Sequence, residues 1–248
     1  MILAAAQTLP HRNNISANLD DHCRFAELAA DQGAQLILFP EMSLTGYERD
    51  QAEVMAFAED DPALEPLRHL AVSKQITIIA GAPIRLDESF HIGAFILQPD
   101  YSVRIYTKQF LHEGEELFFQ PSLVHNPQVR IARKKCGLAI CADIDHAIHA
   151  ERAAEAGNMV YLASLFFTPG GIPKAHRLLP AYAVGHKMQV LMANYCGTSW
   201  NLEAGGQSAF WNNNGKLVGA LDSTIPGLLI VEEGERDWAV TKLSFEHF

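Results

Sequence analysis

The chain has 248 residues, of which 48% are hydrophobic and 19% are charged. This composition is typical of a folded globular protein and excludes the disordered and fibrous classes. The 19 basic and 29 acidic residues leave a net charge of -10, and such a field repels polyanions. We therefore expect neither nucleic acid nor an anionic membrane surface as a partner.

The lack of a recognisable targeting signal and the spacing of the cysteines both favour the cytoplasm. No hydrophobic run approaches the roughly 20 residues that cross a bilayer, and residues 1–7 lack the basic start and the length of a signal peptide. The cysteines form no CxxC pair and no disulfide framework; they are Cys23, Cys136, Cys141 and Cys196. A reducing compartment is the simpler interpretation, so we predict a cytoplasmic protein.

Strands and helices alternate through the first half of the chain. Short apolar runs at residues 2–7, 36–39 and 76–80 are typical of buried strands. Apolar residues at helical spacing predict a helix over residues 16–32. A proline at the first helical position predicts another over residues 61–74.

The second half mixes hairpins with further helices. We expect three hairpins. One joins residues 91–97 to 103–106, one turns at residues 133–135 and leads into a strand at 136–140, and one joins residues 208–211 to 216–221. The other expected elements are helices over 146–156 and 174–187 and strands at 159–163, 190–194 and 227–231, the last being the final core strand. Crossovers and hairpins in one chain predict mixed sheets. Since no repeat or Pro/Ser-rich linker interrupts the pattern, we expect residues 1–248 to form a single α/β domain.

Three apolar runs each end in a reactive polar residue. Glu41, Lys108 and Cys141 stand just past the ends of three predicted strands, where open α/β sheets place ligand sites. Taken singly, each has an ordinary explanation: a solvated loop glutamate, a lysine at a sheet edge and an inert buried cysteine. Their order and sequence context together favour a catalytic group.

The segments around these residues resemble the signatures of the nitrilase, or carbon–nitrogen hydrolase, superfamily. Glu41 lies in LFPEMSLTGY, Lys108 is followed by GEELFFQP, and Cys141 lies in GLAICAD. Short runs at residues 194–197 and 206–208 stand where members of that family keep similar ones. The resemblance spans nearly the whole chain, and the three signatures follow the family's order.

The resemblance implies a four-layer αββα sandwich, in which two mixed β-sheets pack face to face between helices. It also implies a catalytic triad of Glu41, Lys108 and Cys141, with a second glutamate in the loop after the lysine. Counting back from residues 118–121 places that glutamate at Glu115, with Glu116 as the alternative. Family members commonly associate through the helical layer near the cysteine, so we expect a homodimer or a higher homo-oligomer.

These residue types suit amide hydrolysis through a thioester. A free cysteine is mostly protonated at neutral pH, so Cys141 needs a base. Glu41 can take the thiol proton and return it to the departing ammonia or amine, and it works best if burial raises its pKa toward neutrality. Lys108 and the backbone N–H of Ala142 can donate to the oxyanion. Neither a metal nor an organic cofactor is required.

Substrate contacts are expected from the loops that carry Tyr47, Ala142, Asp145, His146 and Leu165. Family members that act on carboxylate-bearing amides often carry an arginine where this chain has Asp145. An aspartate would repel a substrate carboxylate, so we expect a small amide that is neutral or cationic at that end. The alternative is that Asp145 only caps the helix that follows.

Other interpretations stay open. His146 and His149 share one helix face, but catalytic zinc needs three protein ligands and no third has suitable spacing, so no metal is expected. A non-catalytic scaffold member of the fold would be favoured by loss of a triad residue, and none is lost. Among enzymes, nitrile hydrolysis and acyl transfer compete with linear amide hydrolysis, which leads because it is the family's broadest activity.

Overall fold

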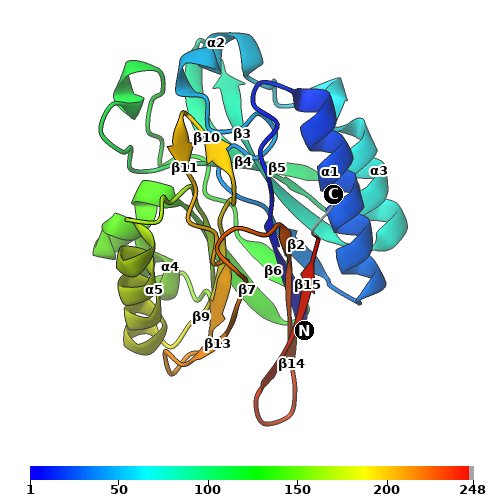
Figure 1. The fold of residues 1–248 in the computed structure, drawn as a ribbon, viewed down its shortest axis with the longest axis vertical. Helices are drawn as coiled ribbons and strands as arrows, with labels where there is room; N and C mark the ends of the chain where they lie inside the picture. The colour runs from blue at the N-terminus through cyan, green and yellow to red at the C-terminus, as the bar shows by residue number, and fades with distance from the viewer. Residues whose placement is uncertain (246–248) are drawn as a thin grey trace.

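The computed structural model describes residues 1–245, which form two β-sheets stacked between two layers of helices (Figure 1). The larger sheet has seven strands: β1 (Ile2–Gln7), β2 (Leu36–Leu38), β3 (Thr77–Leu86), β4 (Ser89–Leu97), β5 (Val103–Thr107), β14 (Gly227–Glu233) and β15 (Trp238–Ser244). The other has six: β6 (Val129–Ile131), β7 (Lys134–Ile140), β8 (Val160–Ser164), β9 (Gln189–Ala193), β12 (Ala209–Trp211) and β13 (Leu217–Ala220).

Helices cover the outer face of each sheet. Helices α1 (Ile15–Asp31) and α3 (Glu65–Lys74) lie along the seven-stranded sheet, and α4 (Ala147–Glu155) and α5 (Ile172–His186) lie on the opposite side of the molecule (Figure 1). A short helix α2 (Ala52–Met55) and a small hairpin of β10 (Thr198–Ser199) and β11 (Leu202–Glu203) stand apart from these layers. Among residues 1–245, no helix has the length and hydrophobicity that crossing a bilayer requires.

Both sheets are mixed. The strand orders are β15-β14-β1-β2-β3-β4-β5 and β13-β12-β9-β8-β7-β6. In the first sheet β1, β2 and β3 run parallel and the remaining pairs are antiparallel. In the second, β7, β8 and β9 run parallel between antiparallel neighbours. The arrangement confirms the expected αββα sandwich.

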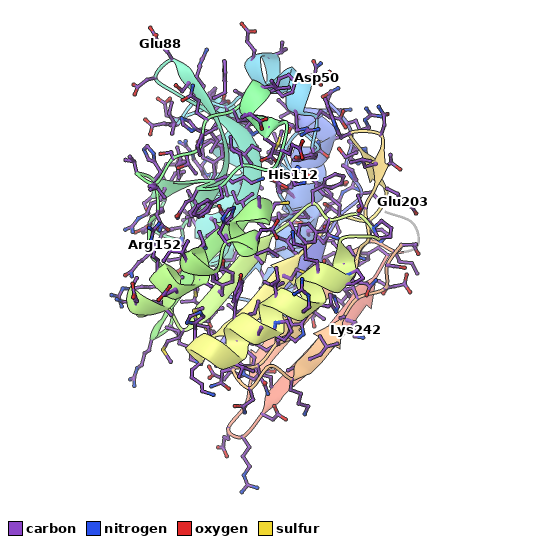
Figure 2. The ribbon with its side chains drawn as sticks, turned by 90° about the vertical axis from the view of Figure 1, so that its left-hand side faces the viewer. Asp50, Glu88, His112, Arg152, Glu203 and Lys242 are labelled. Carbon is purple, nitrogen blue, oxygen red and sulfur yellow. The ribbon has the colours of Figure 1, made fainter. Side chains whose placement is uncertain are left out.

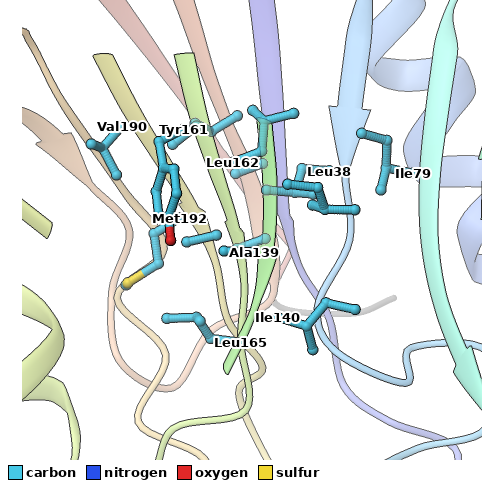
Figure 3. Close-up of a cluster of buried hydrophobic side chains, with 14 of the residues drawn as sticks. Leu38, Ile79, Ala139, Ile140, Tyr161, Leu162, Leu165, Val190 and Met192 are labelled. Atoms are coloured by element: carbon cyan, nitrogen blue, oxygen red, sulfur yellow. The ribbon is translucent and has the colours of Figure 1, made fainter. Parts of the chain in front are cut away.

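The alternation of side chains along the strands builds two cores. In β1, Leu3 and Ala5 face the other sheet, whereas Ala4 and Ala6 belong to the cluster that includes Phe25 of α1, because successive side chains of a strand point to opposite faces. Leucine, isoleucine and alanine side chains from both sheets meet in the central core, as Figure 3 shows. This packing holds the carboxyl ends of β2 and β7 in fixed positions.

The predicted elements exist, with corrections at their ends. Strand β3 continues to Leu86, well past the expected end at residue 80, because residues 78–86 pair with β4. Strand β15 was not predicted; it lies at the edge of its sheet, where half-exposed positions weaken the apolar signal. The first turn of the helix expected from residue 61 is a 3₁₀ turn (Pro62–Leu64), and α5 begins two residues earlier than expected.

Candidate active site

Glu41 is buried where the segment after β2 passes very close to β3. A Cβ atom on Gly81 of β3 would lie 2.5 Å from both the Pro40 carbonyl oxygen and the Met42 nitrogen, so only glycine permits this approach. The segment is then held by a hydrogen bond of 2.9 Å from the Leu44 N–H to the Gly81 carbonyl. As a result the Glu41 side chain has no exposed surface.

Lys108 follows β5 and lies between two carboxylates in the interior. Its Nζ is 2.6 Å from Glu41 Oε1 and 2.8 Å from both oxygens of Glu115. All three side chains are fully buried. Glu115 also accepts hydrogen bonds from the Tyr47 hydroxyl at 2.5 Å and from the His112 N–H at 2.7 Å. Glu116, the alternative raised by the sequence, is exposed, so the structure brings Glu115 to the lysine instead.

Cys141 begins a 3₁₀ turn (Cys141–Asp145) directly after β7. Its φ of 43° lies in the left-handed region, which costs a residue with a Cβ about 1–3 kcal/mol. Only 5% of the residue is exposed, and its Sγ lies 3.7 Å from the Phe166 carbonyl oxygen. Burial, with the nearby Glu41 carboxylate, raises the pKa of the thiol well above its ordinary value, against the opposing effect of Lys108. The resting thiol is therefore protonated and must lose its proton when it reacts.

Electrostatic coupling adjusts the protonation of the neighbouring groups. Burial raises the pKa of the Glu41 carboxyl to about 7, although the Lys108 ammonium lowers it; the Glu115 carboxylate adds to the rise, and the neighbouring Cys141 thiol reduces it. Burial alone would lower the pKa of Lys108, but the negative groups around it hold that pKa above its ordinary value. A carboxyl that exchanges its proton near neutrality thus lies beside a permanent cation and a thiol.

Asp143 joins the cysteine turn to the lysine segment. Its Oδ1 accepts hydrogen bonds from the N–H groups of Gln109 and Phe110, at 3.0 and 2.9 Å. Its Oδ2 accepts from the Ile140 N–H at 2.9 Å and from the Tyr106 hydroxyl at 2.6 Å. Four donors therefore fix one fully buried carboxylate.

A cavity of about 210 Å³ leads to the cysteine. Its wall includes Tyr47, Cys141 and Phe166, and the aromatic rings of Tyr47 and Phe166 stack with their centroids 4.7 Å apart. Trp200 and Leu202, from the β10–β11 hairpin, line another part of the wall. The cavity combines an apolar wall with a few polar groups, as sites for small molecules usually do.

Glu48 holds that hairpin in place. Its carboxylate accepts hydrogen bonds from the Ser199 hydroxyl at 2.9 Å and from the Trp200 N–H at 2.8 Å, and it pairs with the Arg12 guanidinium at 2.7 Å. The segment after Glu41 therefore fixes one wall of the cavity as well as the carboxylate inside it.

A known protein family covers nearly the whole chain, including Glu41, Lys108 and Cys141. The family model described as carbon–nitrogen hydrolase matches residues 2–235. The chain belongs to the carbon–nitrogen hydrolase family. The nitrilase-type amidases that resemble it in structure include proteins with an active-site cysteine, and the protein is a cysteine-dependent amidohydrolase of this type.

Known members of the family are similar over most of their length. The chain is 29% identical over 240 residues to a protein named hydrolase in pqqF 5' region of Pseudomonas protegens, covering 92% of this chain and 82% of that one. It is 26% identical over 202 residues to a nitrilase of Pyrococcus abyssi, covering 79% of this chain and 75% of that one. The solved NitN amidase of Nesterenkonia sp. AN1 has a TM-score of 0.84 and 28% identity, with 95% of this chain and 93% of that chain covered.

Two expected substrate contacts of this carbon–nitrogen hydrolase lie elsewhere. Leu165 has no exposed surface and packs in the core between the sheets (Figure 3), while the next three residues, 166–168, line the cavity instead. His146 is exposed and stacks on Phe110 with ring centroids 3.9 Å apart, away from the cavity lining. Tyr47 and Asp145 do line the cavity, and Ala142 is buried next to Cys141.

Asp145 does not act as an isolated charge. Its Oδ2 lies 2.6 Å from the Nζ of Lys174, which lines the same cavity. The adjacent cation compensates the negative charge, so the expectation of a neutral or cationic substrate, which depended on an unpaired aspartate, loses its basis. Lys174 lies 29 residues farther along the chain, and no local pattern relates the two positions.

His146 and His149, the two histidines considered as metal ligands, have different partners: His146 stacks on Phe110, and His149 contacts two tyrosines. His149 is buried, and its ring nitrogens lie 2.9 Å from the Tyr106 hydroxyl and 2.8 Å from the Tyr161 hydroxyl. Burial lowers the pKa of this imidazole. Among residues 1–245, no three His, Cys, Asp or Glu side chains are grouped as metal ligands would be.

Proposed function

We propose that the protein hydrolyses the carbon–nitrogen bond of small linear amides through a thioester on Cys141. The observation that carries this proposal is the fully buried contact of 2.6 Å between Lys108 Nζ and Glu41 Oε1 near the Cys141 thiol. With a pKa of about 7, the Glu41 carboxyl can accept and return a proton near neutrality. Its position beside Lys108 and Cys141 supports the triad of Glu41, Lys108 and Cys141, with Glu115 as the second carboxylate that holds the lysine.

The first half of the reaction acylates the cysteine. The Cys141 thiol proton passes to Glu41 as the sulfur attacks the amide carbon, and the carbonyl electron pair moves onto the oxygen. One N–H of Lys108 and the backbone N–H of Ala142 stabilise that oxyanion. When the tetrahedral intermediate collapses, the carbon–nitrogen bond breaks, and the proton held by Glu41 goes to the departing ammonia or amine.

The second half releases the acid. Water attacks the thioester carbon while Glu41 takes one of its protons. Collapse of the second tetrahedral intermediate breaks the carbon–sulfur bond, and the proton returns to the sulfur. All atoms come from the amide and one water molecule, so the cycle uses no cofactor.

The size of the cavity supports a small substrate. Its volume of about 210 Å³ lies below the roughly 300–1,000 Å³ that is common for ligand pockets. A cysteine-to-alanine mutant of the Nesterenkonia amidase is known in complex with butyramide (TM-score 0.82, 27% identity, 93% of this chain and 89% of that chain covered). Nitrile hydrolysis and acyl transfer to an amine would use the same three residues and remain the alternative activities.

The test is ammonia release from a panel of small amides, ureas and nitriles. We expect the amides to be the best substrates, Cys141→Ala to abolish the reaction, and Cys23→Ala, on the far-side helix α1, to retain it. Absence of ammonia release from every amide, or full activity in Cys141→Ala, would contradict the proposal. Preferential labelling of Cys141 over the half-exposed Cys23 by iodoacetamide distinguishes an enzyme from a scaffold protein.

The proposal extends to a homodimer through α4 and α5. These helices lie side by side on one outer face of the molecule (Figure 2) and carry exposed apolar side chains, including Ile148 and Val184. We expect light scattering to give the mass of a dimer, Ile148→Asp to give a monomer, and Val54→Asp, on the distant α2, to remain dimeric.

The proposal also places the protein in the cytoplasm. The free cysteines suit this reducing compartment, and cell fractionation tests the location.

A further inference from the structure

Arg49 carries the one cavity-lining charge that has no ionic partner among the described residues. The other cavity-lining Lys and Asp side chains, Lys174 and Asp145, compensate each other at 2.6 Å. Arg49 forms no ion pair with any residue in the range 1–245. The net charge of the wall is therefore positive, and it is located on a guanidinium.

The guanidinium is fixed but mostly unsatisfied. Its carbon lies 4.8 Å from the centroid of the Trp200 ring and 5.6 Å from that of the Tyr47 ring, so two aromatic faces hold it. Its one hydrogen bond to a described residue runs from Nη1 to the Glu113 carbonyl at 3.3 Å. Its Nε is buried and has no hydrogen-bond partner in the same part of the chain. A guanidinium has five N–H donors, so several remain for a ligand.

Arg49 lies where it can contact a substrate that is bound at Cys141. It lines the same cavity as Cys141, and it stacks against Tyr47, whose hydroxyl binds the Glu115 that holds Lys108. The cavity is small, so a substrate that reaches both the sulfur and the guanidinium has only a short carbon chain between its ends. An anion at the far end would meet a planar donor that suits carboxylate geometry.

The geometry points to Arg49 as the specificity-determining residue, which binds a carboxylate at the end of the substrate remote from the scissile amide. The preferred substrates are then monoamides of short dicarboxylic acids. This inference rests on the proposed amide hydrolysis and names the substrate class of the same site. It replaces the preference that an isolated Asp145 would have imposed.

The test compares glutaramate with glutaramide, which has the same carbon chain but a neutral far end. We expect wild-type kcat/KM to favour glutaramate over glutaramide, and the cationic 5-aminopentanamide to be the poorest of the three. Arg49→Met should reduce the glutaramate-to-glutaramide ratio roughly 10- to 100-fold, the usual effect of losing a hydrogen bond between charged groups. Arg49→Lys, which keeps the charge but not the planar donor, should give an intermediate ratio.

A matched control removes the neighbouring ion pair without changing the net charge. The double variant Asp145→Asn/Lys174→Met should keep the wild-type ratio, because only the compensated charges are lost. A wild-type ratio near one, or a ratio unchanged in Arg49→Met, overturns the assignment. A ratio that falls as far in the double variant as in Arg49→Met overturns it too.

Binding measurements separate this inference from the proposed reaction. In the Cys141→Ala background, calorimetry should detect glutaramate binding, and Arg49→Met should weaken it by the same 10- to 100-fold. If the wild-type protein hydrolyses no amide but this Arg49-dependent binding is found, the carboxylate site stands and the proposed reaction fails. If amides are hydrolysed but glutaramate binds equally well without Arg49, the reaction stands and the inference fails.

Discussion

Asp143 accepts a hydrogen bond of 3.0 Å from the backbone N–H of Gln109, and this bond joins the turn that carries Cys141 to the segment that begins at Lys108. The other carboxylate oxygen binds the Ile140 N–H and the Tyr106 hydroxyl. Because the two segments are more than thirty residues apart in sequence, the relative position of thiol and ammonium depends on this carboxylate. Asp143 is therefore a positioning residue.

Replacement of Asp143 by asparagine tests this role. An amide keeps the shape but presents one NH₂ group to donors, so about two of the four hydrogen bonds are lost, at roughly 2–4 kcal/mol in total. We expect Tm to fall by roughly 5–15 °C, and kcat to fall more than KM changes at a temperature where the variant is fully folded. Iodoacetamide labelling of Cys141 should slow as well. Asp145→Asn, two residues away and exposed, is the control for stability; equal Tm losses in both variants would contradict the prediction.

The pH dependence of catalysis depends on Glu115. The active form needs an ionised Glu41, whose pKa is about 7, so kcat/KM should rise with pH through about 7. The negative charge of Glu115 contributes to that raised pKa. Glu115→Gln should therefore move the acid limb of the kcat/KM profile to lower pH, while Glu116→Gln, at the exposed neighbouring position, leaves it near 7. An unchanged limb in Glu115→Gln would be inconsistent with this coupling.

Lys108 has two roles in the proposed mechanism: it donates a hydrogen bond to the oxyanion, and its charge lowers the pKa of Glu41. In Lys108→Met the oxyanion loses a donor, and the pKa of Glu41 rises because the cation that lowers it is absent. We expect kcat to fall by at least roughly 10²–10³ at pH 7, and the free energy of unfolding to fall by roughly 3–5 kcal/mol because buried carboxylates lose their cation. Lys134→Met, which removes a partly exposed lysine paired with Glu233, is the control. Activity within tenfold of wild type in Lys108→Met would refute the proposed role.

The fold and the reactive groups could be predicted because they depend on local patterns. Apolar runs mark the strands, and Glu41, Lys108 and Cys141 each stand one to three residues beyond a strand end. Strands β1 and β2 run parallel in one sheet, and β7 and β8 run parallel in the other, so the strands of each pair end at the same edge of their sheet. The face-to-face packing of the two sheets brings those edges together. Local patterns placed the three residues at strand ends, whereas the grouping of all three and the choice of Glu115 came from the resemblance to the nitrilase family.

The cavity wall could not be predicted because it is made by contacts between distant loops. Trp200 reaches the cavity through Glu48, 152 residues earlier in the chain, and nothing in the sequence around either residue indicates the pair. Arg49 stands two residues after Tyr47, the last residue of the first signature segment, and this position could have indicated that it lies near the cavity. The sequence could not indicate that its charge has no ionic partner among the described residues. His146 follows Asp145 directly, yet its ring packs on Phe110 because adjacent residues at a helix start point in different directions.

His22 is a buried imidazole that contacts the segment carrying Glu41, and we expect it to limit stability in acid. Its ring lies between the Asn18 carbonyl, at 2.6 Å, and the Ser43 hydroxyl, at 2.8 Å, and stacks on Phe39 at 4.0 Å. A carbonyl only accepts, so Nδ1 carries the proton and Nε2 is the acceptor of the neutral ring. Burial lowers the pKa of this imidazole from 6.5 to about 4.

A folded-state pKa below the unfolded value means that the unfolded state gains the proton first as the pH falls. The His22 contribution is thus fully present above about pH 6.5 and is lost progressively toward pH 4, by up to about 3 kcal/mol. Urea unfolding between pH 7 and pH 4 should show a smaller loss of unfolding free energy in His22→Phe and in His22→Gln than in wild type, even though both variants start from a lower stability. His69→Phe, at an exposed histidine of α3, should follow the wild-type curve. Parallel curves for wild type and both His22 variants would show that this imidazole does not set the acid limit, since the proton uptake would then occur elsewhere.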